Sequence, residues 1–565
     1  MAAPVPAIYA DRREQMYPML EPWEVDRLRR FGEVQRWADG EALVRVGDTG
    51  AGTSVILSGE VVITQQSGVS ERQQIWAHQP GSFIGELAQL SGRPSLVDAH
   101  ARGPVEAVVI SPEKLRALLV AEAELGERIM RALILRRVGL IRLGTVGPVI
   151  VGRADDGDVL RLENFLGRNG HPHQTLNPEA DPDAKTLLER FQIDPGELPI
   201  VLCPGGQILR NPGEAELARC IGLVRAIDPD KVYDAAIVGA GPAGLAAAVY
   251  AASEGLSVLV LDCRAFGGQA GASARIENYL GFPTGITGMA LMARAYNQAQ
   301  KFGAEMAIPD ETVRLEPASA TASGRLVLSL ASGEQVNARA VVLASGARYR
   351  RPHVENLEAF EGSSVHYWAS PLEARLCAGQ EVALVGAGNS AGQAVVYLAA
   401  QVAKVWLLVR GPSLEASMSH YLIERIAAQP NIEVVLNSEI CALEGHGGTL
   451  QAVHWKNRRS GDETRCELRH LFLFIGADPN TDWLSQSGVE LDSKGFVLAD
   501  PGVGTGRRAG WSPAPGVFAI GDVRSGSVKR VAASVGEGAQ VVAALHALLA
   551  EAEEAAAPAP VAAMV

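Results

Sequence analysis

The sequence predicts a multidomain chain with a β-rich first domain, a small α/β domain and two parallel α/β units after them. Its 565 residues exceed one domain several-fold, because about 150 residues per domain is the usual size. Short β-type runs broken by glycines fill residues 28–119. Further on, a strand, glycine turn, helix and strand pattern occurs twice, the second copy 147 residues after the first (386 − 239).

Composition excludes several functional classes. The chain is 47% hydrophobic and 20% charged, which is typical of a soluble globular protein. Its net charge of −13 argues against nucleic acid as a partner. We expect no signal sequence, because the N-terminus lacks a charged segment followed by an apolar one, and no membrane span, because no apolar run reaches about 18 residues. None of the six cysteines is spaced CxxC, so we expect neither a metal site nor a local redox dithiol, and we expect a reducing cytoplasm.

Residues 1–19 are expected to be a loose lead-in, and residues 20–143 a β-sandwich or barrel closed by a helical stretch, Pro112–Arg142. The segment Gly81–Ala88 reads GSFIGELA. It resembles the phosphate cassette of the cyclic-nucleotide-binding domains of catabolite-activator-type proteins. That resemblance implies that the backbone and side chains of Gly85, Glu86 and Leu87 hold a cyclic phosphate and its ribose.

The cassette departs from its family at the arginine that pairs with the cyclic phosphate. Ser95 stands in that place, and Arg93 lies two positions early. Loss of a charge-assisted phosphate contact weakens binding strongly. We therefore predict a retained jelly-roll that has lost its ligand, with the alternative that Arg93 reaches the phosphate. No helix-turn-helix follows, so a transcription factor is excluded.

Residues 145–230 are predicted to run β-α-β-α-β-β-α, an order that resembles thioredoxin and glutaredoxin domains. Pro199 stands in the place of the cis-proline of that family. The slot of its reactive CxxC reads Ala154–Gly157, without cysteine, and Asp155–Asp158 are expected to cap the helix. We expect Cys203 and Cys220 to be small buried residues, and the domain to be a redox-inactive docking or spacer module.

Residues 231–350 begin with the first glycine turn. An apolar run, Ala235–Val238, enters the turn, an Ala-rich helix follows, and a second run ends on an acid 18 residues past the last glycine (262 − 244). Strand, glycine turn, helix, strand and acid form a dinucleotide-binding unit, in which the acid holds a ribose and the helix N-terminus a pyrophosphate. The predicted contacts are Gly239, Gly241, Pro242, Ala243, Gly244 and Asp262.

The next motifs resemble the low-molecular-weight, bacterial-type thioredoxin reductases. They are Gly267-Gly268-Gln269, the stretch Ile276–Pro283 (IENYLGFP) and the strand and turn Val341–Ala347. The resemblance spans about Val232 to Leu549 and implies a homodimer with FAD held by residues 231–350 and 476–550. The flavin contacts that it implies are Gly268, Gln269, Asn278, Gly346, Gly521, Asp522, Arg530, Val531 and Ala532. Residues 551–565 are expected to be a disordered tail.

Residues 351–475 carry the second glycine turn and are predicted to hold a nicotinamide nucleotide. Its second strand ends on Arg410 instead of an acid. An acid would hold the bare ribose of NADH, whereas arginine pairs with the extra phosphate of NADPH. The sequence therefore favours NADPH, although NADH is also possible. The alternative is that Arg410 is only a solvated charge at the end of the strand. The contacts expected here are Gly386, Gly388, Asn389, Ser390, Ala391 and Arg410.

Thioredoxin reductases carry their catalytic CxxC just before this unit, but residues 366–373 read HYWASPLE. We expect Tyr367 and Trp368 to cover the flavin ring and Glu373 to supply a proton. The predicted function is hydride transfer from NADPH to FAD and onward to an unidentified acceptor, such as a redox protein, without the usual dithiol. Two alternatives stay open: a disulfide reductase that uses a cysteine outside the motif, and a nucleotide or redox sensor regulated through the first domain.

Overall fold

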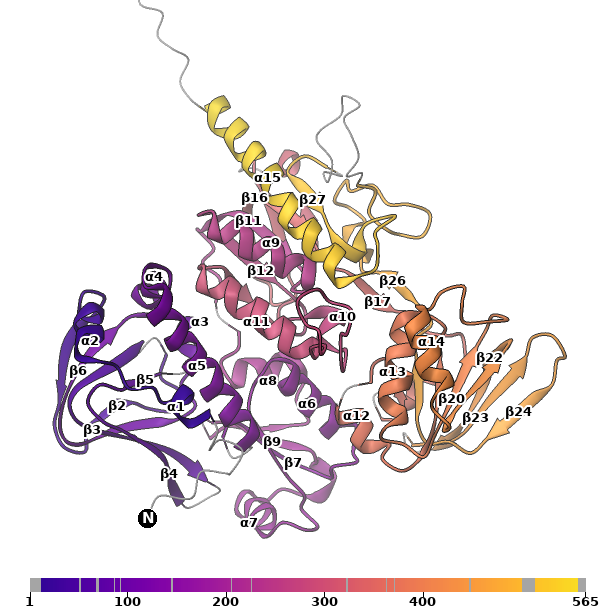
Figure 1. Ribbon diagram of the computed structural model, residues 1–565, viewed down its shortest axis with the longest axis horizontal. Coiled ribbons are helices and arrows are strands. Elements are labelled where there is room, and N and C mark those ends of the chain that lie inside the picture. The colour runs from indigo at the N-terminus through magenta and orange to yellow at the C-terminus, as the bar shows by residue number, and fades with distance from the viewer. Residues whose placement is uncertain are drawn as a thin grey trace, which may run out of the picture. The chain divides into compact units, whose positions relative to one another are not determined.

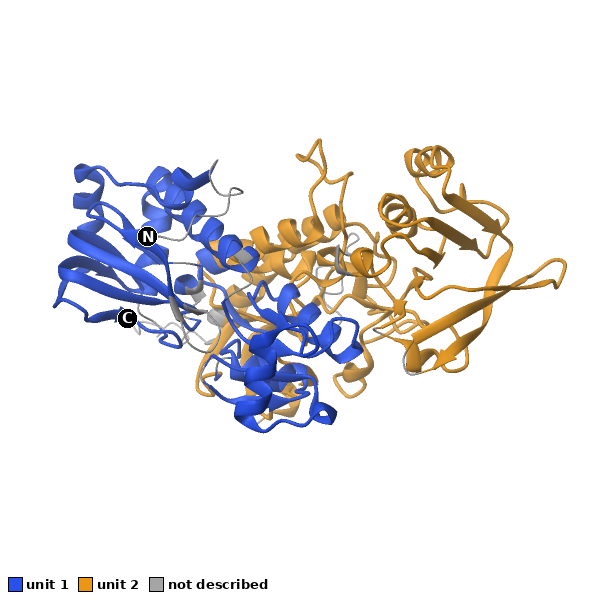
Figure 2. Ribbon diagram, turned by 90° about the horizontal axis from the view of Figure 1, so that it is seen from below, with its two compact units in different colours: residues 1–226, 300–309 blue, residues 227–299, 310–565 orange. Residues whose placement is uncertain are grey.

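The computed structural model divides the chain into two compact units (Figure 2). The first contains residues 1–226 and 300–309, and the second contains residues 227–299 and 310–565. The structure describes residues 12–49, 52–67, 71–85, 87–91, 93–143, 146–204, 206–224, 226–321, 324–361, 363–369, 371–446, 449–499 and 514–556.

The first domain of unit 1 is a β-roll of antiparallel strands. Its order is β1-β6-β3-β4, with β2 beside β6 and β5 beside β3. The expected helical stretch consists of two helices, interrupted at Glu122, whose buried carboxylate accepts from Arg27 and Arg30. The elements are α1 (Arg13–Met16), α2 (Pro22–Arg29), β1 (Glu33–Trp37), β2 (Ala42–Val44), β3 (Thr53–Ser67), β4 (Glu71–His78), β5 (Phe83–Ile84), α3 (Ala88–Ser91), β6 (Asp98–Ile110), α4 (Pro112–Ala121) and α5 (Ala123–Leu143).

The expected loose lead-in is wrong from residue 12 onward, and residues 1–11 lie outside the described ranges. Met16 is buried, and the ring of Tyr17 stacks on Trp76 with centroids 4.1 Å apart. Apolar burial and ring stacking hold this segment against the β-roll.

The second domain of unit 1 follows the predicted order β-α-β-α-β-β-α. Its sheet order is β10-β9-β7-β8, in which only β7 and β8 run parallel. Asp156 caps the first helix by accepting from the backbone N–H of Asp158, and the peptide bond before Pro199 is cis. The elements are β7 (Val149–Val151), α6 (Gly157–Arg168), β8 (Gln174–Leu176), α7 (Pro182–Phe191), η2 (Pro195–Glu197), β9 (Ile200–Leu202), β10 (Ile208–Arg210) and α8 (Glu214–Cys220).

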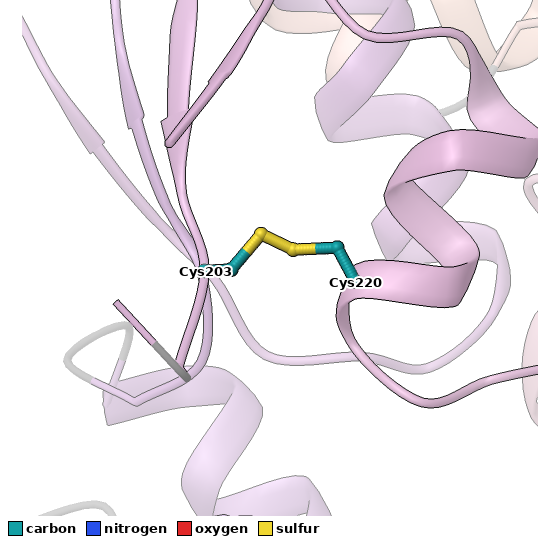
Figure 3. Close-up of a disulfide and its surroundings, with 2 residues drawn as sticks. All are labelled: Cys203 and Cys220. Carbon is teal, nitrogen blue, oxygen red and sulfur yellow. A yellow bond between two sulfur atoms is a disulfide. The ribbon is translucent and has the colours of Figure 1, made fainter. Parts of the chain in front are cut away.

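One interpretation of this domain is wrong. Cys203 and Cys220 are not two separate buried thiols but form a disulfide that joins the end of β9 to the end of α8 (Figure 3). Their sequence separation of 17 gave no spacing signal, because the fold, and not a short motif, brings the two cysteines together.

Unit 2 begins with a sheet of order β12-β11-β16-β15-β14, with β27 beside β16. Strands β11, β12, β16 and β27 run parallel, so their carboxyl ends and the helix N-termini that follow lie at one edge. The elements are β11 (Val232–Val238), α9 (Pro242–Ser253), β12 (Val258–Leu261), α10 (Gly268–Gly271), α11 (Gly288–Lys301), β14 (Thr312–Glu316), η3 (Ala318–Ala320), β15 (Leu326–Leu330), β16 (Gln335–Leu343), β27 (Val517–Ala519), η6 (Gly521–Val523) and α15 (Val531–Ala556). Strand β13 (Glu305–Ala307) lies within residues 300–309, which belong to unit 1.

Helix α15 packs on α9, where a Cβ added at Gly538 would lie 2.5 Å from the carbonyl oxygen of Ala243 (Figure 1). Within the described residues, Val531–Ala552 is the one helix whose length and composition would suit a membrane span. Of its most apolar window, 33% is buried, and Gly538 packs closely on α9. The helix also makes residues 551–556 of the expected disordered tail helical; residues 557–565 lie outside the described residues.

The remaining part of unit 2 has a parallel sheet of order β18-β25-β19-β20-β21 between two layers. Val382 and Leu384 of β19 pack with helices α13 and α14, whereas Ala383 and Val385 pack toward strands β22 and β23. The elements are β17 (Ala347–Tyr349), η4 (Leu357–Phe360), β18 (Val365–His366), α12 (Pro371–Leu376), β19 (Glu381–Val385), α13 (Asn389–Ala399), β20 (Lys404–Val409), α14 (His420–Ala427), β21 (Ile432–Leu436), β22 (Ser438–His446), β23 (Thr449–Asn457), β24 (Glu463–Cys466), β25 (Leu471–Leu473), β26 (Ala477–Pro479) and η5 (Asp482–Leu484).

Candidate active site

The turn between β11 and α9 requires glycine at two places. Gly239 has a φ of +114°, and a Cβ there would lie 2.1 Å from the carbonyl oxygen of Ala344. A Cβ at Gly244 would lie 1.8 Å from the carbonyl oxygen of Gly239. Both contacts are far below van der Waals separation, so these glycines let helix and strand approach each other.

Gly241 has a different surrounding. Its backbone is extended and it precedes the first residue of α9. The nearest atom to an added Cβ would be the Cα of Gly268, 3.9 Å away. Gly241 and Gly268 therefore face each other across a gap, which a side chain at either position would narrow. The gap lies beside the N-terminus of α9, where the first backbone N–H groups of a helix have no partner within the helix.

These elements enclose a cavity of about 350 Å³, within the range of about 300–1,000 Å³ usual for small-molecule sites. It is bounded by the N-termini of α9, α13 and α15, so both predicted nucleotide units contribute to one cavity. The predicted residues on its wall are Gly239, Gly241, Pro242, Ala243, Asp262, Gly268, Gln269, Asn278, Gly346, Trp368, Asn389, Ser390, Asp522, Arg530, Val531 and Ala532.

Other predicted contacts lie behind the wall or away from it. A Cβ at Gly521 would meet the Cβ of Ala243 at 2.8 Å, and one at Gly386 would meet the carbonyl oxygen of Phe474 at 2.6 Å. Arg410 is exposed after β20. Described residues that were predicted as contacts but do not line the cavity are Gly244, Gly386, Gly388, Ala391, Arg410, Gly521, Tyr367 and Glu373.

The carboxylate of Asp262 holds the first turn in shape. One oxygen accepts from the backbone N–H of Ala240 at 2.9 Å, and the other accepts from that of Arg264 at 3.1 Å. The side-chain amide of Gln269 donates to the carbonyl oxygen of Ala347. Both side chains lie on the cavity wall, and both are oriented by the protein backbone.

A basic group lies where α15 begins. The Lys529 ammonium donates to the carbonyl oxygen of Asp522 and, at 3.1 Å, to the hydroxyl of Ser527. Burial lowers the pKa of Lys529 and raises the pKa of Asp522. The start of α15 adds the positive end of its dipole, so this wall favours an anionic ligand.

Of the three residues predicted to act in catalysis, Trp368 alone lies on the described cavity wall. Its indole N–H donates to Oε1 of Glu373 at 2.9 Å, and the guanidinium of Arg264 lies 5.9 Å from its ring centre. Glu373 is buried behind it. The Tyr367 hydroxyl donates to Glu361 instead, and burial raises the pKa of Tyr367. Glu373 thus orients Trp368.

Cys377, the cysteine nearest in sequence to the missing motif, is fully buried and does not line the cavity. Burial, followed by the nearby Glu373 carboxylate, raises the pKa of Cys377 to about 12. Since the thiolate is the nucleophile in disulfide exchange, this thiol is unreactive at neutral pH.

The β-roll holds a second, smaller cavity of about 70 Å³, lined by Tyr17, Trp76, Gly85, Ser95 and Arg136 among others. Arg136, from α5, donates to the carbonyl oxygens of Met16 at 2.8 Å, Phe83 at 3.0 Å and Gly85 at 2.8 Å. No sequence signal marked Arg136 as part of the cassette.

The other cassette residues do not form a phosphate site in the described ranges. The Ser95 hydroxyl donates to the carbonyl oxygen of Val97 at 2.9 Å. Burial and then Arg137 lower the pKa of the His171 imidazole, and the charge of Arg93 adds to the same shift. Leu87 packs on the apolar core, and Glu86 lies outside the described residues.

Two known protein families match parts of this chain. The pyridine nucleotide-disulphide oxidoreductase family matches residues 233–538, more than half of the chain. The chain belongs to that family. The cyclic nucleotide-binding domain family matches residues 34–122, so the predicted combination of a thioredoxin-reductase-like part and a cyclic-nucleotide-binding-like domain is confirmed.

The relatives include one subunit of the alkyl hydroperoxide reductase of Escherichia coli strain K12, 32% identical over 308 residues, which are 54% of this chain and 56% of the relative. The chain thus spans about half the length of such relatives. The thioredoxin reductase of Mycolicibacterium smegmatis is 32% identical over 54% of this chain and 93% of its own length. The crystal structure of the T. acidophilum thioredoxin reductase aligns with a TM-score of 0.51 and 28% identity over 56% of this chain and 99% of its own.

The family uses FAD and NADPH, and its members are oxidoreductases, so the predicted cofactors and enzyme class are confirmed at the level of the family. The site fits such a dinucleotide. Gly241 and Gly268 leave room for a ligand to approach the backbone, a helix N-terminus and Lys529 favour an anion, and Asp262 lies on the wall.

Proposed function

We propose that this chain is an NADPH oxidoreductase that passes electrons through FAD to an acceptor other than a dithiol at the family position. One observation supports the proposal most directly. A single cavity is bounded by the helix N-termini of both nucleotide units, and no cysteine is among the residues described on its wall. When bound, FAD would accept a hydride from the nicotinamide and pass its two electrons to the next acceptor.

Different residues of the chain bind the two nucleotides and shape the cavity around them. Gly241, Gly268 and the N-terminus of α9 admit and hold a diphosphate, and Asp262 keeps the turn in shape. Asn389 and Ser390, at the N-terminus of α13, face the same cavity and suit the nicotinamide nucleotide. Trp368, held by Glu373, presents its indole on the wall of the same cavity.

The test is an anaerobic titration of the purified yellow protein, first with NADPH and then with NADH. We expect the flavin absorbance to bleach with about one equivalent of NADPH per flavin. The absence of bleaching with either nucleotide would overturn the proposal and favour a sensor.

NADPH preference is proposed on Arg410, which is exposed after β20 where NADH enzymes carry an acid. We expect Arg410→Ala to lower kcat/KM for NADPH at least tenfold and to leave kcat/KM for NADH unchanged, because NADH lacks the phosphate. Equal losses with both nucleotides would contradict that role. We also propose a cytoplasmic homodimer.

A second candidate function is favoured by one observation. The disulfide between Cys203 and Cys220 is a sulfur pair outside the family motif, and a disulfide reductase would need such a pair.

A further inference from the structure

The thioredoxin-like domain carries its sulfur pair at a place different from the usual one. The usual slot, Ala154–Gly157, lies at the start of α6 near Pro199, since a Cβ at Gly152 would approach the Cβ of Pro199 to 3.1 Å. Cys203 follows the other end of β9, four residues past Pro199, or about 13 Å along a strand at about 3.3 Å per residue.

Two segments position the pair. Just after β9, the backbone N–H of Gly206 donates to the carbonyl oxygen of Cys203 at 2.8 Å. Cys220 is the last residue of α8 (Glu214–Cys220). The Cα atoms of the two cysteines are 6.1 Å apart, within the range of disulfides, and Figure 3 shows the bond spanning from strand to helix.

The two cysteine residues differ in exposure. Cys203 is 4% exposed and packs in an apolar cluster with Phe165 and Leu217, whereas Cys220 is only partly buried at its rim. Disulfide exchange needs one sulfur that a thiol can reach and a second that closes the bond again. The pair has that asymmetry at the level of the residues, because Cys220 is the partly exposed cysteine and Cys203 the buried one.

We infer that Cys203 and Cys220 form a two-electron redox site of this chain, cycling between a disulfide and two thiols. The inference rests on the proposed function for its electron source, a reduced nicotinamide. NADPH, one proton and the disulfide give NADP⁺ and two thiols, so the S–S bond breaks and two S–H bonds form.

The reduced pair then exchanges with a disulfide of a partner. The Cys220 thiolate attacks one sulfur of that disulfide, whose other sulfur leaves as a thiol, and a mixed disulfide remains. The Cys203 thiolate attacks Cys220, which releases the second partner thiol and restores the original bond. The partner class is therefore a small or protein disulfide.

The experiment labels thiols in the holoenzyme. The protein is reduced anaerobically with NADPH, quenched in acid, treated with N-ethylmaleimide in denaturant and mapped by mass spectrometry. We expect Cys203 and Cys220 to gain label only after reduction, and the protein to take up a second equivalent of NADPH that the double variant Cys203→Ser/Cys220→Ser does not consume. Exposed Cys441 should label in both states and serves as the internal control.

The outcomes separate this inference from the proposed function. Flavin bleaching with Cys203 and Cys220 unlabelled would leave the function and overturn the inference, making the bond a structural crosslink. If NADPH bleaches nothing, the proposed function fails, and a second arm decides the inference. In that arm, light with 5-deazaflavin and EDTA reduces the holoenzyme without nicotinamide. Label on both cysteines, absent from the flavin-free protein treated alike, supports the redox site; unlabelled cysteines refute it.

Discussion

At the scale of single residues, the indole of Trp368 depends on a buried carboxylate, and a substitution can remove that bond while keeping an aromatic wall. We expect Trp368→Phe to lower the free energy of unfolding of the holoenzyme by about 1–3 kcal/mol, because Oε1 of buried Glu373 loses the indole donor. Urea unfolding measures this. Trp406→Phe is the matched control, since the Trp406 indole donates to Glu381 at an exposed position. Equal losses in both variants would contradict the positioning role.

Two glycines at equivalent places in the two nucleotide units provide a paired test. Gly241 and Gly388 both precede their helices in extended conformations, and a Cβ at either meets no atom closer than 3.9 Å. A Cβ therefore fits at both positions, and the extended backbone there suits a β-branched residue such as valine. We expect Gly241→Val to purify with at least tenfold less FAD per chain, because its side chain fills the gap beside Gly268.

Gly388→Val should keep its FAD and raise KM for NADPH, since its turn belongs to the second unit. Flavin absorbance per polypeptide and steady-state kinetics provide the two readouts, and far-ultraviolet circular dichroism checks that both variants fold. Loss of FAD from both variants alike would show that the two turns do not have separate tasks.

At the scale of elements, local pattern predicted much of the fold. The apolar runs before Gly239 and Gly386 are strands, and the residues after them begin helices, because the turn chemistry, the strand period and the helix all lie within one stretch of sequence. The thioredoxin-like order was predictable for the same reason.

Contacts between distant elements were not predictable in this way. Cys203 meets Cys220 only because α8 packs beside β9, and Arg136 reaches the carbonyl oxygen of Gly85 from a helix that the cassette pattern does not include. Such pairings follow from tertiary packing, about which a local sequence motif carries no information.

His171, which lies just before β8, is a histidine whose protonated form is disfavoured in the folded protein. His171 is buried, its Nδ1 donates to the carbonyl oxygen of Pro172 at 2.9 Å, and burial, with Arg137 nearby, lowers its pKa to about 3. Between that value and about 6.5 the unfolded chain binds the extra proton, so stability rises with pH. This contribution is complete above about pH 6.5 and is lost on acidification.

We expect the free energy of unfolding to fall by up to about 1.4 kcal/mol per pH unit below pH 6.5 from this one group. His171→Asn keeps a donor for Pro172 and should flatten the profile between pH 7.5 and 5.0, as followed by urea unfolding. Exposed His420→Asn is the control and should leave the slope unchanged. An unchanged slope in His171→Asn would refute the assignment.

At the scale of the whole molecule, the chain joins a family oxidoreductase to a domain of the cyclic-nucleotide-binding type, and the question is whether the second controls the first. Regulation by a ligand requires that the ligand bind the two states of the protein differently, and therefore that it bind at all. The cavity of the β-roll, about 70 Å³, is far below the volume usual for small-molecule sites.

We therefore expect neither 3′,5′-cyclic AMP nor 3′,5′-cyclic GMP to bind at concentrations up to about 1 mM, measured by isothermal titration calorimetry, and neither to change the rate of flavin reduction by NADPH. Arg136 and Tyr17 lie in the cavity, and Ser95 stands where a phosphate-binding arginine is needed. Ser95→Arg alone should not restore binding, because Arg136 stays bonded to Gly85 and Phe83. Micromolar binding to the unaltered chain, together with an altered reduction rate, would instead establish the sensor, because only a ligand that distinguishes two states of the protein can change that rate.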